Sequence, residues 1–201
     1  MESPDLLAVL HRYRGSAPMV VAAGRRGREM VTIAGDDPLV LYNMDMPYAT
    51  PVCLGMARTM RDVKVVALEG DGNVLAGLGG LSTVGRYQPD NLIVLIVDNE
   101  SYGSFGAGAV TTATSAGVDL EVVARGCGIA NSCTVRDLPE AEDALRRAFS
   151  EPGPWVIVAK VANLGDSDAR FWISPPDILE NAFTFEQALR ASGTNAPRLR
   201  G

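Results

Sequence analysis

Apolar and polar positions form two kinds of pattern along the chain. Short runs are apolar on both faces, most clearly at residues 92–97, as expected of strands buried in a parallel sheet. Longer segments repeat apolar residues at helical spacing. We predict strands at residues 19–23, 38–42, 64–68, 92–97, 130–135 and 155–161. We predict helices at residues 6–13, 47–61, 74–87, 118–127, 139–149 and 185–191, and another after the turn at Gly24, with Ser3 capping the first.

The order of these elements predicts a fold. Strands and helices alternate, which favours parallel βαβ units with helices on both faces of the sheet. We therefore expect an α/β domain of three layers (α/β/α) with a mainly parallel central sheet, spanning residues 1–192. The segment 101–114 is rich in small residues and is predicted to be a loop. Residues 193–201 are expected to be a disordered tail.

Composition narrows the range of functions. The 201 residues carry a net charge of −6, which disfavours nucleic acid or an anionic membrane surface as a partner. The longest purely aliphatic run, 92–97, is too short to span a bilayer. Three cysteines without a CxxC pair suit a reducing cytoplasm. The single histidine, His11, lies in the first predicted helix, so histidine-based acid–base chemistry is disfavoured.

Two polar clusters follow buried strands. Residues 70–73 (GDGN) close one strand and residues 98–101 (DNES) close the next. Ligands of open parallel sheets sit beyond the carboxyl ends of strands, so we expect Asp71 and Asn99 to converge there. A carboxylate, an amide oxygen and a backbone carbonyl suit Mg²⁺, which also binds phosphate oxygens. The alternative is that Asp71 and Asn99 are ordinary turn residues.

The clusters resemble the signature of thiamine-diphosphate-dependent enzymes, in which GDG precedes an asparagine within a narrow range of separations. Here Asp71 and Asn99 are 28 positions apart (99 − 71 = 28), and DNESYG follows the second strand. The resemblance covers roughly residues 18–161 and includes YNMDMPYATPVCLGMA, VDLEVVARGCGI and GPWVIVAKV. It implies the family's fold, with Asp71, Asn99 and the Ser101 carbonyl as Mg²⁺ ligands.

The same resemblance implies the remaining cofactor contacts. A Met44 carbonyl would accept the N–H of the aminopyrimidine, and Met46 would lie under the bent cofactor. Other residues expected to bind the cofactor are Gly70, Gly72, Asn73, Ser101, Tyr102 and Gly103. The glycine-rich segment 103–108 is expected to cover the active site.

The chain has room for only the diphosphate-binding half of such an enzyme. It resembles the β subunit of two-subunit sulfopyruvate decarboxylases and the matching half of phosphonopyruvate decarboxylases, down to YGS at residues 102–104. This implies a lyase that decarboxylates a 2-oxo acid, with the activating glutamate on a separate pyrimidine-binding subunit. The alternatives are a carboligase subunit of the acetolactate-synthase kind and a non-catalytic cofactor-binding regulatory subunit. The apolar segment 105–110 departs from the family and favours a substrate less charged than a sulfonate or phosphonate.

Several other residues allow two interpretations. Gly77, Gly79 and Gly80 resemble a dinucleotide loop but fall inside a predicted helix, where close packing explains them better. The arginines at 25, 26 and 28 either bind an anion or an acidic partner, or line a solvated turn. Glu69 and Glu100 are interpreted as groups that support the metal site or face the surface.

Overall fold

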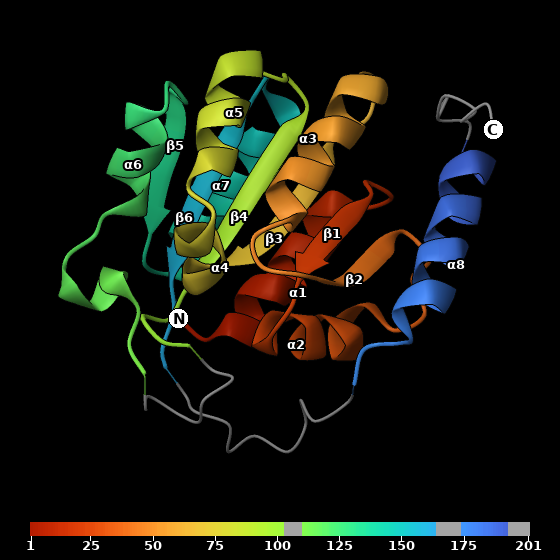
Figure 1. Ribbon diagram of the computed structural model, residues 1–201, viewed down its shortest axis with the longest axis horizontal. Helices are drawn as coiled ribbons and strands as arrows, with labels where there is room; N and C mark the ends of the chain where they lie inside the picture. The colour runs from red at the N-terminus through yellow and green to blue at the C-terminus, as the bar shows by residue number, and fades with distance from the viewer. Residues whose placement is uncertain (103–109, 164–173, 193–201) are drawn as a thin grey trace.

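The computed structural model describes residues 1–102, 110–163 and 174–192. Within these ranges, six parallel strands form one sheet in the order β2-β1-β3-β4-β6-β5 (Figure 1). The strands are β1 (Met19–Ala22), β2 (Val40–Met44), β3 (Val65–Gly70), β4 (Leu92–Asp98), β5 (Asn131–Val135) and β6 (Trp155–Lys160). The predicted α/β class and parallel sheet are confirmed.

Helices cover both faces of this sheet and produce three layers. Helices α3 to α6 lie in front of the sheet in the view of Figure 1, and α1 and α7 lie behind it. The helices are α1 (Ser3–Arg14), α2 (Arg25–Ala34), α3 (Ala49–Thr59), α4 (Asp71–Ala76), α5 (Gly79–Tyr87), the 3₁₀ turn η2 (Ala113–Ala116), α6 (Leu120–Gly126), α7 (Leu138–Ser150) and α8 (Ile178–Ala191).

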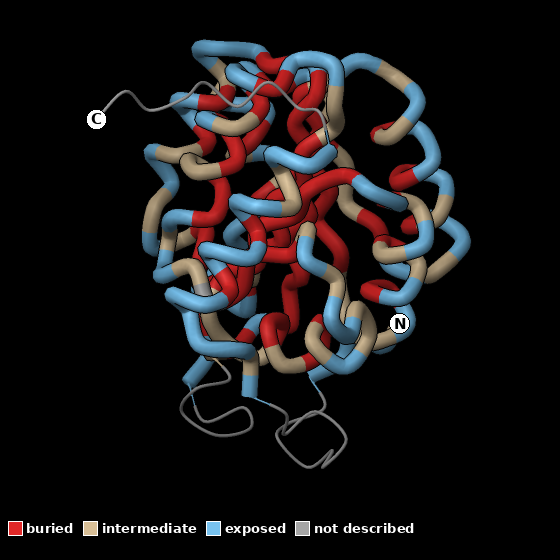
Figure 2. Tube along the Cα trace, turned by 90° about the vertical axis from the view of Figure 1, so that its right-hand side faces the viewer, coloured by how far each residue is buried: buried red, intermediate tan, exposed pale blue. Residues whose placement is uncertain are grey.

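The core lies on the two faces of the sheet. Every residue of β4 is buried, which agrees with its apolar pattern on both faces. In β3, Val66 and Leu68 pack with α1, α2 and α7, whereas Val65 and Ala67 pack on the opposite face. Figure 2 shows the buried trace running through the centre of the molecule with exposed segments around it. The two apolar layers hold the carboxyl ends of β3 and β4 side by side, in register from Val65–Leu92 to Gly70–Val97.

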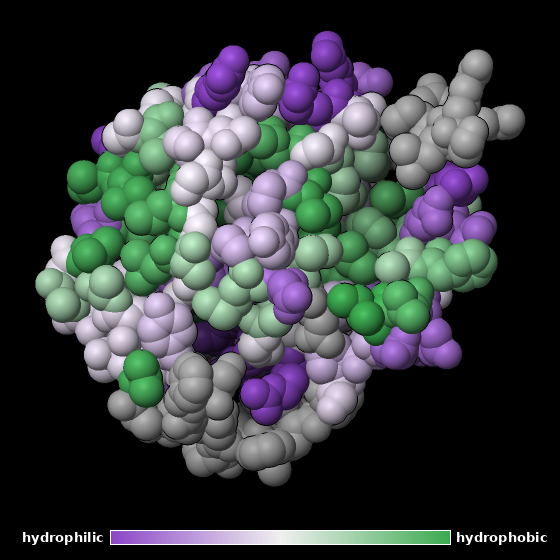
Figure 3. Space-filling view, in the orientation of Figure 1, coloured by the Kyte–Doolittle hydropathy of each residue, from purple (hydrophilic) through white to green (hydrophobic). Residues whose placement is uncertain are grey.

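Helix α8 covers the edge strand β2. The Asn181 side chain accepts a hydrogen bond from the Tyr42 N–H at 2.8 Å and donates one to the Val40 carbonyl at 3.0 Å. It therefore bonds the free edge of β2 as a neighbouring strand would. The outer side of α8 exposes Leu179 and Phe183, and Figure 3 shows hydrophobic side chains over both α6 and α8. Among the described residues, no helix is long and apolar enough to cross a bilayer.

The helix predicted at residues 74–87 is wrong as a single element. Helix α4 begins three residues earlier, at Asp71, and ends at Ala76; α5 begins at Gly79. The break lies where Pro47 packs against Gly77, since a Cβ atom on Gly77 would lie 2.1 Å from Pro47 Cγ. Close packing therefore explains Gly77, but the glycine is at the break rather than inside a helix.

Two further differences are small. Glu2, not Ser3, is the N-cap of α1, because the Ser3 hydroxyl donates to Glu29 of α2 at 2.6 Å. The last helix begins at Ile178 rather than at residue 185. All three cysteines are free thiols. The predicted tail at residues 193–201 lies outside the described residues.

Candidate active site

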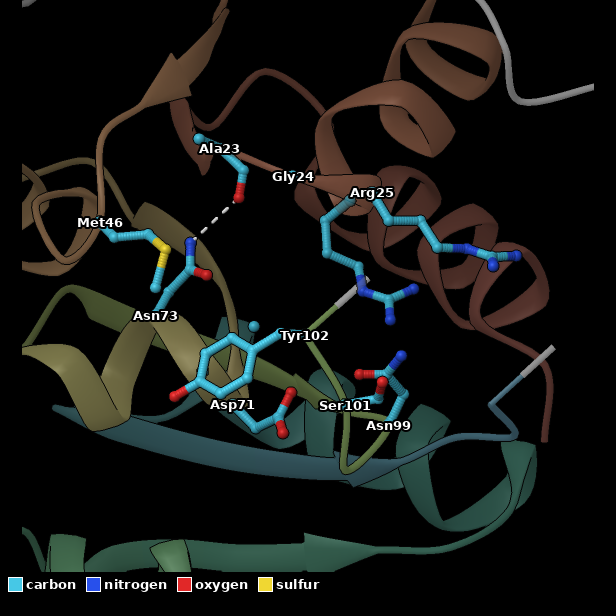
Figure 4. A pocket seen from close by; sticks show the side chains of 12 residues that line it. Ala23, Gly24, Arg25, Met46, Asp71, Asn73, Asn99, Ser101 and Tyr102 are labelled. Atoms are coloured by element: carbon cyan, nitrogen blue, oxygen red, sulfur yellow. Dashed lines mark hydrogen bonds between the residues drawn. The ribbon is translucent and has the colours of Figure 1, made fainter. Parts of the chain in front are cut away.

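A pocket opens beyond the carboxyl ends of β1, β3 and β4, where the sequence placed the two polar clusters. Its lining comes from four separate segments of the chain. The lining residues are Ala23, Gly24, Arg25, Arg26, Met46, Gly70, Asp71, Gly72, Asn73, Asn99, Ser101 and Tyr102. In Figure 4 the Tyr102 ring is drawn between Met46 and Asn73 on one side and Asp71, Asn99 and Ser101 on the other.

The structure thus brings together nearly all the residues expected to bind cofactor or metal. Asp71 and Asn99 line the same pocket, as their positions at adjacent strand ends predicted. Met44 is not among the lining residues, and its carbonyl accepts a hydrogen bond from the Ala23 N–H at 2.7 Å. Gly103 and the expected cover at residues 103–108 lie outside the described residues, as does the apolar segment 105–110 except for Val110, which is exposed.

Asp71 is the buried anionic group of the pocket, with 2% of its surface exposed. Its Oδ2 atom accepts hydrogen bonds from the Thr112 hydroxyl and, at 3.3 Å, from the Thr114 hydroxyl. Burial raises the pKa of Asp71; the Thr112 bond opposes the rise, and the nearby Asp98 carboxylate adds to it. A carboxylate in this environment gains stability from a cation more than an exposed one would.

Asn99 and Ser101 are held in a tight turn after β4. Glu100, between them, has a φ of 60°, in the left-handed region, and its N–H donates to the Asp98 carboxylate at 3.1 Å. The Ser101 hydroxyl donates to the Val110 carbonyl at 3.2 Å. The Ser101 hydroxyl is therefore engaged within the chain, which agrees with a metal-binding role for its backbone carbonyl rather than its side chain.

The opposite wall combines an amide, an aromatic ring and an apolar side chain. The Asn73 side chain donates to the Ala23 carbonyl at 3.2 Å, which ties the first turn of α4 to the end of β1 (Figure 4). A Cβ atom on Gly72 would lie 2.4 Å from the Tyr102 ring, so glycine is required there by a side chain of the pocket itself. Met46 is 40% exposed and is a free apolar surface at the mouth of the pocket.

Arg25 and Arg26 give the pocket positive charge. Both line it, and both are tied to Glu29, through Arg25 Nε at 2.6 Å and Arg26 NH1 at 2.7 Å. Arg26 also donates to the Ser3 hydroxyl at 2.6 Å. The solvated-turn interpretation is therefore wrong for Arg25 and Arg26, which line the pocket and pair with Glu29 within the chain. Arg25 and Arg26 are the first two residues of α2, and they line the pocket together with Gly70 and Gly72.

Several residues of the site were not predicted. Thr112 and Thr114 come from a segment that was interpreted only as a loop, and no local pattern marks them. Asp98 was noticed as part of a cluster but received no role. Lys160, at the end of β6, bonds Asp98 at 2.8 Å and Glu100 at 2.9 Å. Glu100 is thus an exposed residue paired with Lys160.

Glu69 is buried rather than on the surface. Its Oε1 atom accepts hydrogen bonds from the Thr50 N–H and hydroxyl, both at 2.9 Å, at the start of α3. Its Oε2 atom has no hydrogen-bond partner in the described part of the chain. Burial raises the pKa of Glu69 to about 7, against the effect of the Thr50 hydrogen bonds. Glu69 therefore ties the end of β3 to α3 rather than facing solvent.

Comparison with known proteins identifies the family. Residues 15–159 match the family described as thiamine pyrophosphate enzyme, C-terminal TPP binding domain. The chain belongs to the thiamine pyrophosphate enzyme family. Thiamine pyrophosphate is the same compound as thiamine diphosphate, so the family resemblance inferred from GDGN and DNESYG is confirmed.

The relatives in this family include both short and long chains. Sulfopyruvate decarboxylase subunit beta of Methanocaldococcus jannaschii is 36% identical over 147 residues, which cover 73% of this chain and 74% of that subunit. Phosphonopyruvate decarboxylase of Streptomyces viridochromogenes is 36% identical over 161 residues, covering 77% of this chain but 39% of that protein. The crystal structure of benzoylformate decarboxylase from Polynucleobacter necessarius is 22% identical with a TM-score of 0.66, covering 81% of this chain and 33% of that one. The fold therefore recurs as one part of longer chains.

The residues of the pocket fit the cofactor of this family. Asp71 and Asn99 supply the hard oxygen atoms that Mg²⁺ prefers, and a backbone carbonyl at Ser101 would add a third. Arg25 and Arg26 supply positive charge for phosphate oxygens. No cluster of three or more histidine, cysteine or acidic side chains suited to a metal occurs in the described residues. A Mg²⁺ site built from one carboxylate, one amide and a carbonyl requires no such cluster.

Proposed function

We propose that this chain is the diphosphate- and Mg²⁺-binding subunit of a thiamine-diphosphate-dependent lyase that decarboxylates a 2-oxo acid. The observation that carries the proposal is the convergence of Asp71, Asn99 and Ser101 on one pocket, opposite Met46 and beside Arg25. The decarboxylase names of its relatives support the reaction class. When bound, the cofactor supplies the nucleophilic thiazolium carbon and accepts the electrons released as CO₂ leaves.

The chain's own residues bind and orient. Asp71, Asn99 and the Ser101 carbonyl would hold Mg²⁺, whose positive charge would offset the negative charge of the diphosphate. Gly72 and Asn73, in the first turn of α4, would lie against the diphosphate, whose negative charge Arg25 and Arg26 would help offset. Met46 would press on the rings from the pocket mouth and set the angle between them. The carbonyl of Met44, at the end of β2, would accept the aminopyrimidine N–H with its second lone pair.

The second half of the active site would come from a partner. The chain spans 39% of a single-chain phosphonopyruvate decarboxylase but 74% of a subunit named beta. We propose a separate pyrimidine-binding subunit that covers the exposed Met46 and brings the glutamate that activates the cofactor. His11, the sole histidine of the chain, lies on α1 rather than in the pocket lining, so proton transfer at the reacting carbon falls to that partner.

The test is CO₂ release from 2-oxo acids by the purified chain with thiamine diphosphate and Mg²⁺, with and without the partner subunit. Sulfopyruvate, phosphonopyruvate and pyruvate form the substrate panel, because their tails range from a doubly charged phosphonate through a singly charged sulfonate to an uncharged methyl group. We expect no turnover by the chain alone and turnover when the partner is added. Robust CO₂ release without a second polypeptide would contradict the shared-site proposal, and no release with any substrate in the assembled enzyme would contradict decarboxylation.

A further inference from the structure

The Asp98 carboxylate is bonded to the turn that carries two of the groups expected to bind metal, Asn99 and Ser101. It ends β4, is 1% exposed, and accepts the Glu100 N–H through Oδ1 at 3.1 Å. This bond closes the turn that carries Asn99 and Ser101. Because Glu100 adopts a positive φ that residues other than glycine rarely adopt, the turn needs such support from a side chain.

Thr114 contacts both Asp98, at the end of β4, and Asp71, just after the end of β3. Its hydroxyl lies 2.8 Å from Asp98 Oδ1 and 3.3 Å from Asp71 Oδ2. It also contacts the Thr112 hydroxyl at 2.9 Å, and Thr112 bonds the same oxygen of Asp71. Both threonines are buried. The threonine pair therefore holds Asp71 by its Oδ2 oxygen.

Lys160 fixes the second oxygen of Asp98. Its Nζ atom lies 2.8 Å from Asp98 Oδ2, and Asp98 and Lys160 are direct partners in the β4–β6 register. Lys160 also reaches Glu100 at 2.9 Å. Asp98 is thus held on both oxygens, by the backbone turn and Thr114 on one side and by a lysine on the other. A carboxylate restrained in this way can hold the groups bonded to it, the Glu100 N–H and the Thr114 hydroxyl, in fixed positions.

We infer that Thr114 and Asp98 are positioning residues of the Mg²⁺ site, which fix Asp71 relative to Asn99 and the Ser101 carbonyl. The inference rests on the proposed function, since the metal is the one proposed there. Mg²⁺ requires near-octahedral geometry, so a small displacement of one ligand weakens binding. Groups that orient metal ligands typically contribute about 10–100-fold in metal affinity.

The experiment is calorimetric titration of Mg²⁺ into the enzyme assembled from this chain and its partner subunit, in the presence of thiamine diphosphate. Thr114→Val keeps the shape of the side chain and removes the hydroxyl; we expect Mg²⁺ affinity to fall by roughly 10–100-fold. Thr114→Ser retains the hydroxyl and should restore affinity close to that of the wild type. Thr111→Val makes the same change at an exposed position three residues away and should leave affinity unchanged. Thermal unfolding without metal is measured for each protein.

The outcomes separate this inference from the function on which it rests. Equal Mg²⁺ affinity in wild type and Thr114→Val overturns the inference, as does a lower melting temperature with unchanged affinity. If Thr114→Val does not fold, Thr114→Ala removes the same hydroxyl without steric conflict and is held to the same expectation. An assembled wild-type enzyme that binds no Mg²⁺ with thiamine diphosphate overturns the proposed function, and the inference with it.

Discussion

Glu29 and Asp71 are both buried carboxylates, but the chain holds them in opposite ways. Glu29 is bound by the guanidinium groups of Arg25 and Arg26 and by the Ser3 hydroxyl. Asp71 is bound by hydroxyl groups and has a second carboxylate, Asp98, as its neighbour. The negative charge of Glu29 is therefore neutralised within the chain, whereas that of Asp71 is supported but not neutralised by these contacts.

The pKa directions express this difference. Burial acts to raise the pKa of Glu29, but the Arg26 charge and the hydrogen bonds from Ser3, Arg25 and Arg26 outweigh it, so the pKa is lowered. Burial raises the pKa of Asp71, and its hydrogen bonds do not reverse the rise. When burial destabilises the ionised form of a carboxylate, that carboxylate gains the most stability from an added cation. The contrast assigns the Glu29 cluster to the stability of the fold and supports the proposed metal site at Asp71.

Replacing Asp71 should have the largest effect. We expect Asp71→Ala to abolish Mg²⁺-dependent binding of thiamine diphosphate, a loss well beyond the roughly 10–100-fold cost of removing a supporting group. The fold should remain intact, and the isosteric Asp71→Asn should raise the melting temperature of the metal-free chain. Calorimetry of the assembled enzyme and thermal unfolding of the chain measure these effects. Unchanged cofactor affinity would refute the role of Asp71.

Replacing Glu29 should instead destabilise the fold. Glu29→Gln removes the carboxylate that pairs with the buried Arg26 guanidinium, and breaking a buried ion pair in this way typically costs about 3–5 kcal/mol in the free energy of unfolding. Because the folded pKa is lowered from 4.5, this stabilisation is complete above the unfolded value and is lost as the pH falls through the folded value. The difference between wild type and variant, from urea unfolding, should therefore be largest near neutral pH and shrink below about pH 4.5.

A matched control for that variant is available on the surface. Glu142→Gln breaks the ion pair with Arg12, whose side chain is 64% exposed, and should change stability by less than about 1 kcal/mol. Equal losses from Glu29→Gln and Glu142→Gln would show that burial does not distinguish the two pairs.

Replacing Met46 tests the role of the uncharged side of the pocket. Met46→Ala should slow hydrogen–deuterium exchange at the thiazolium carbon of the assembled enzyme, by up to about 100-fold, while weakening cofactor affinity much less. The reason is that the thioether side chain orients the rings, whereas the charged wall binds the diphosphate. Exchange as fast as in the wild type would exclude this positioning role.

The chemistry of the site was predictable where it was local in sequence. Asp71 and Asn99 follow apolar strands directly, and adjacent parallel strands must bring their carboxyl ends together. Thr112 and Thr114 reach Asp71 only through the return of a later segment, which no spacing encodes. Arg25 and Arg26 remained undecided because a turn rich in arginine looks the same whether it faces solvent or a pocket.

The fold, too, was predictable only where its cause is local in sequence. The strands were predictable because complete burial leaves an unbroken apolar run, as in β4. The break between α4 and α5 was not, because its cause is Pro47, thirty positions from Gly77 in sequence (77 − 47 = 30). The start of α8 was placed too late because Leu179 and Phe183 are apolar yet exposed, so its first turns lack a one-sided pattern.

The Asn181 side chain has a consequence for how the protein can be shortened. The family match ends at residue 159, but the amide that occupies the outer edge of β2 belongs to α8, beyond that limit. A version truncated after β6 would keep every pocket residue and still present an open strand to other molecules. Open strands recruit further strands, and self-association is the usual result. We therefore expect that a version free of self-association must be longer than the segment that contains the pocket residues.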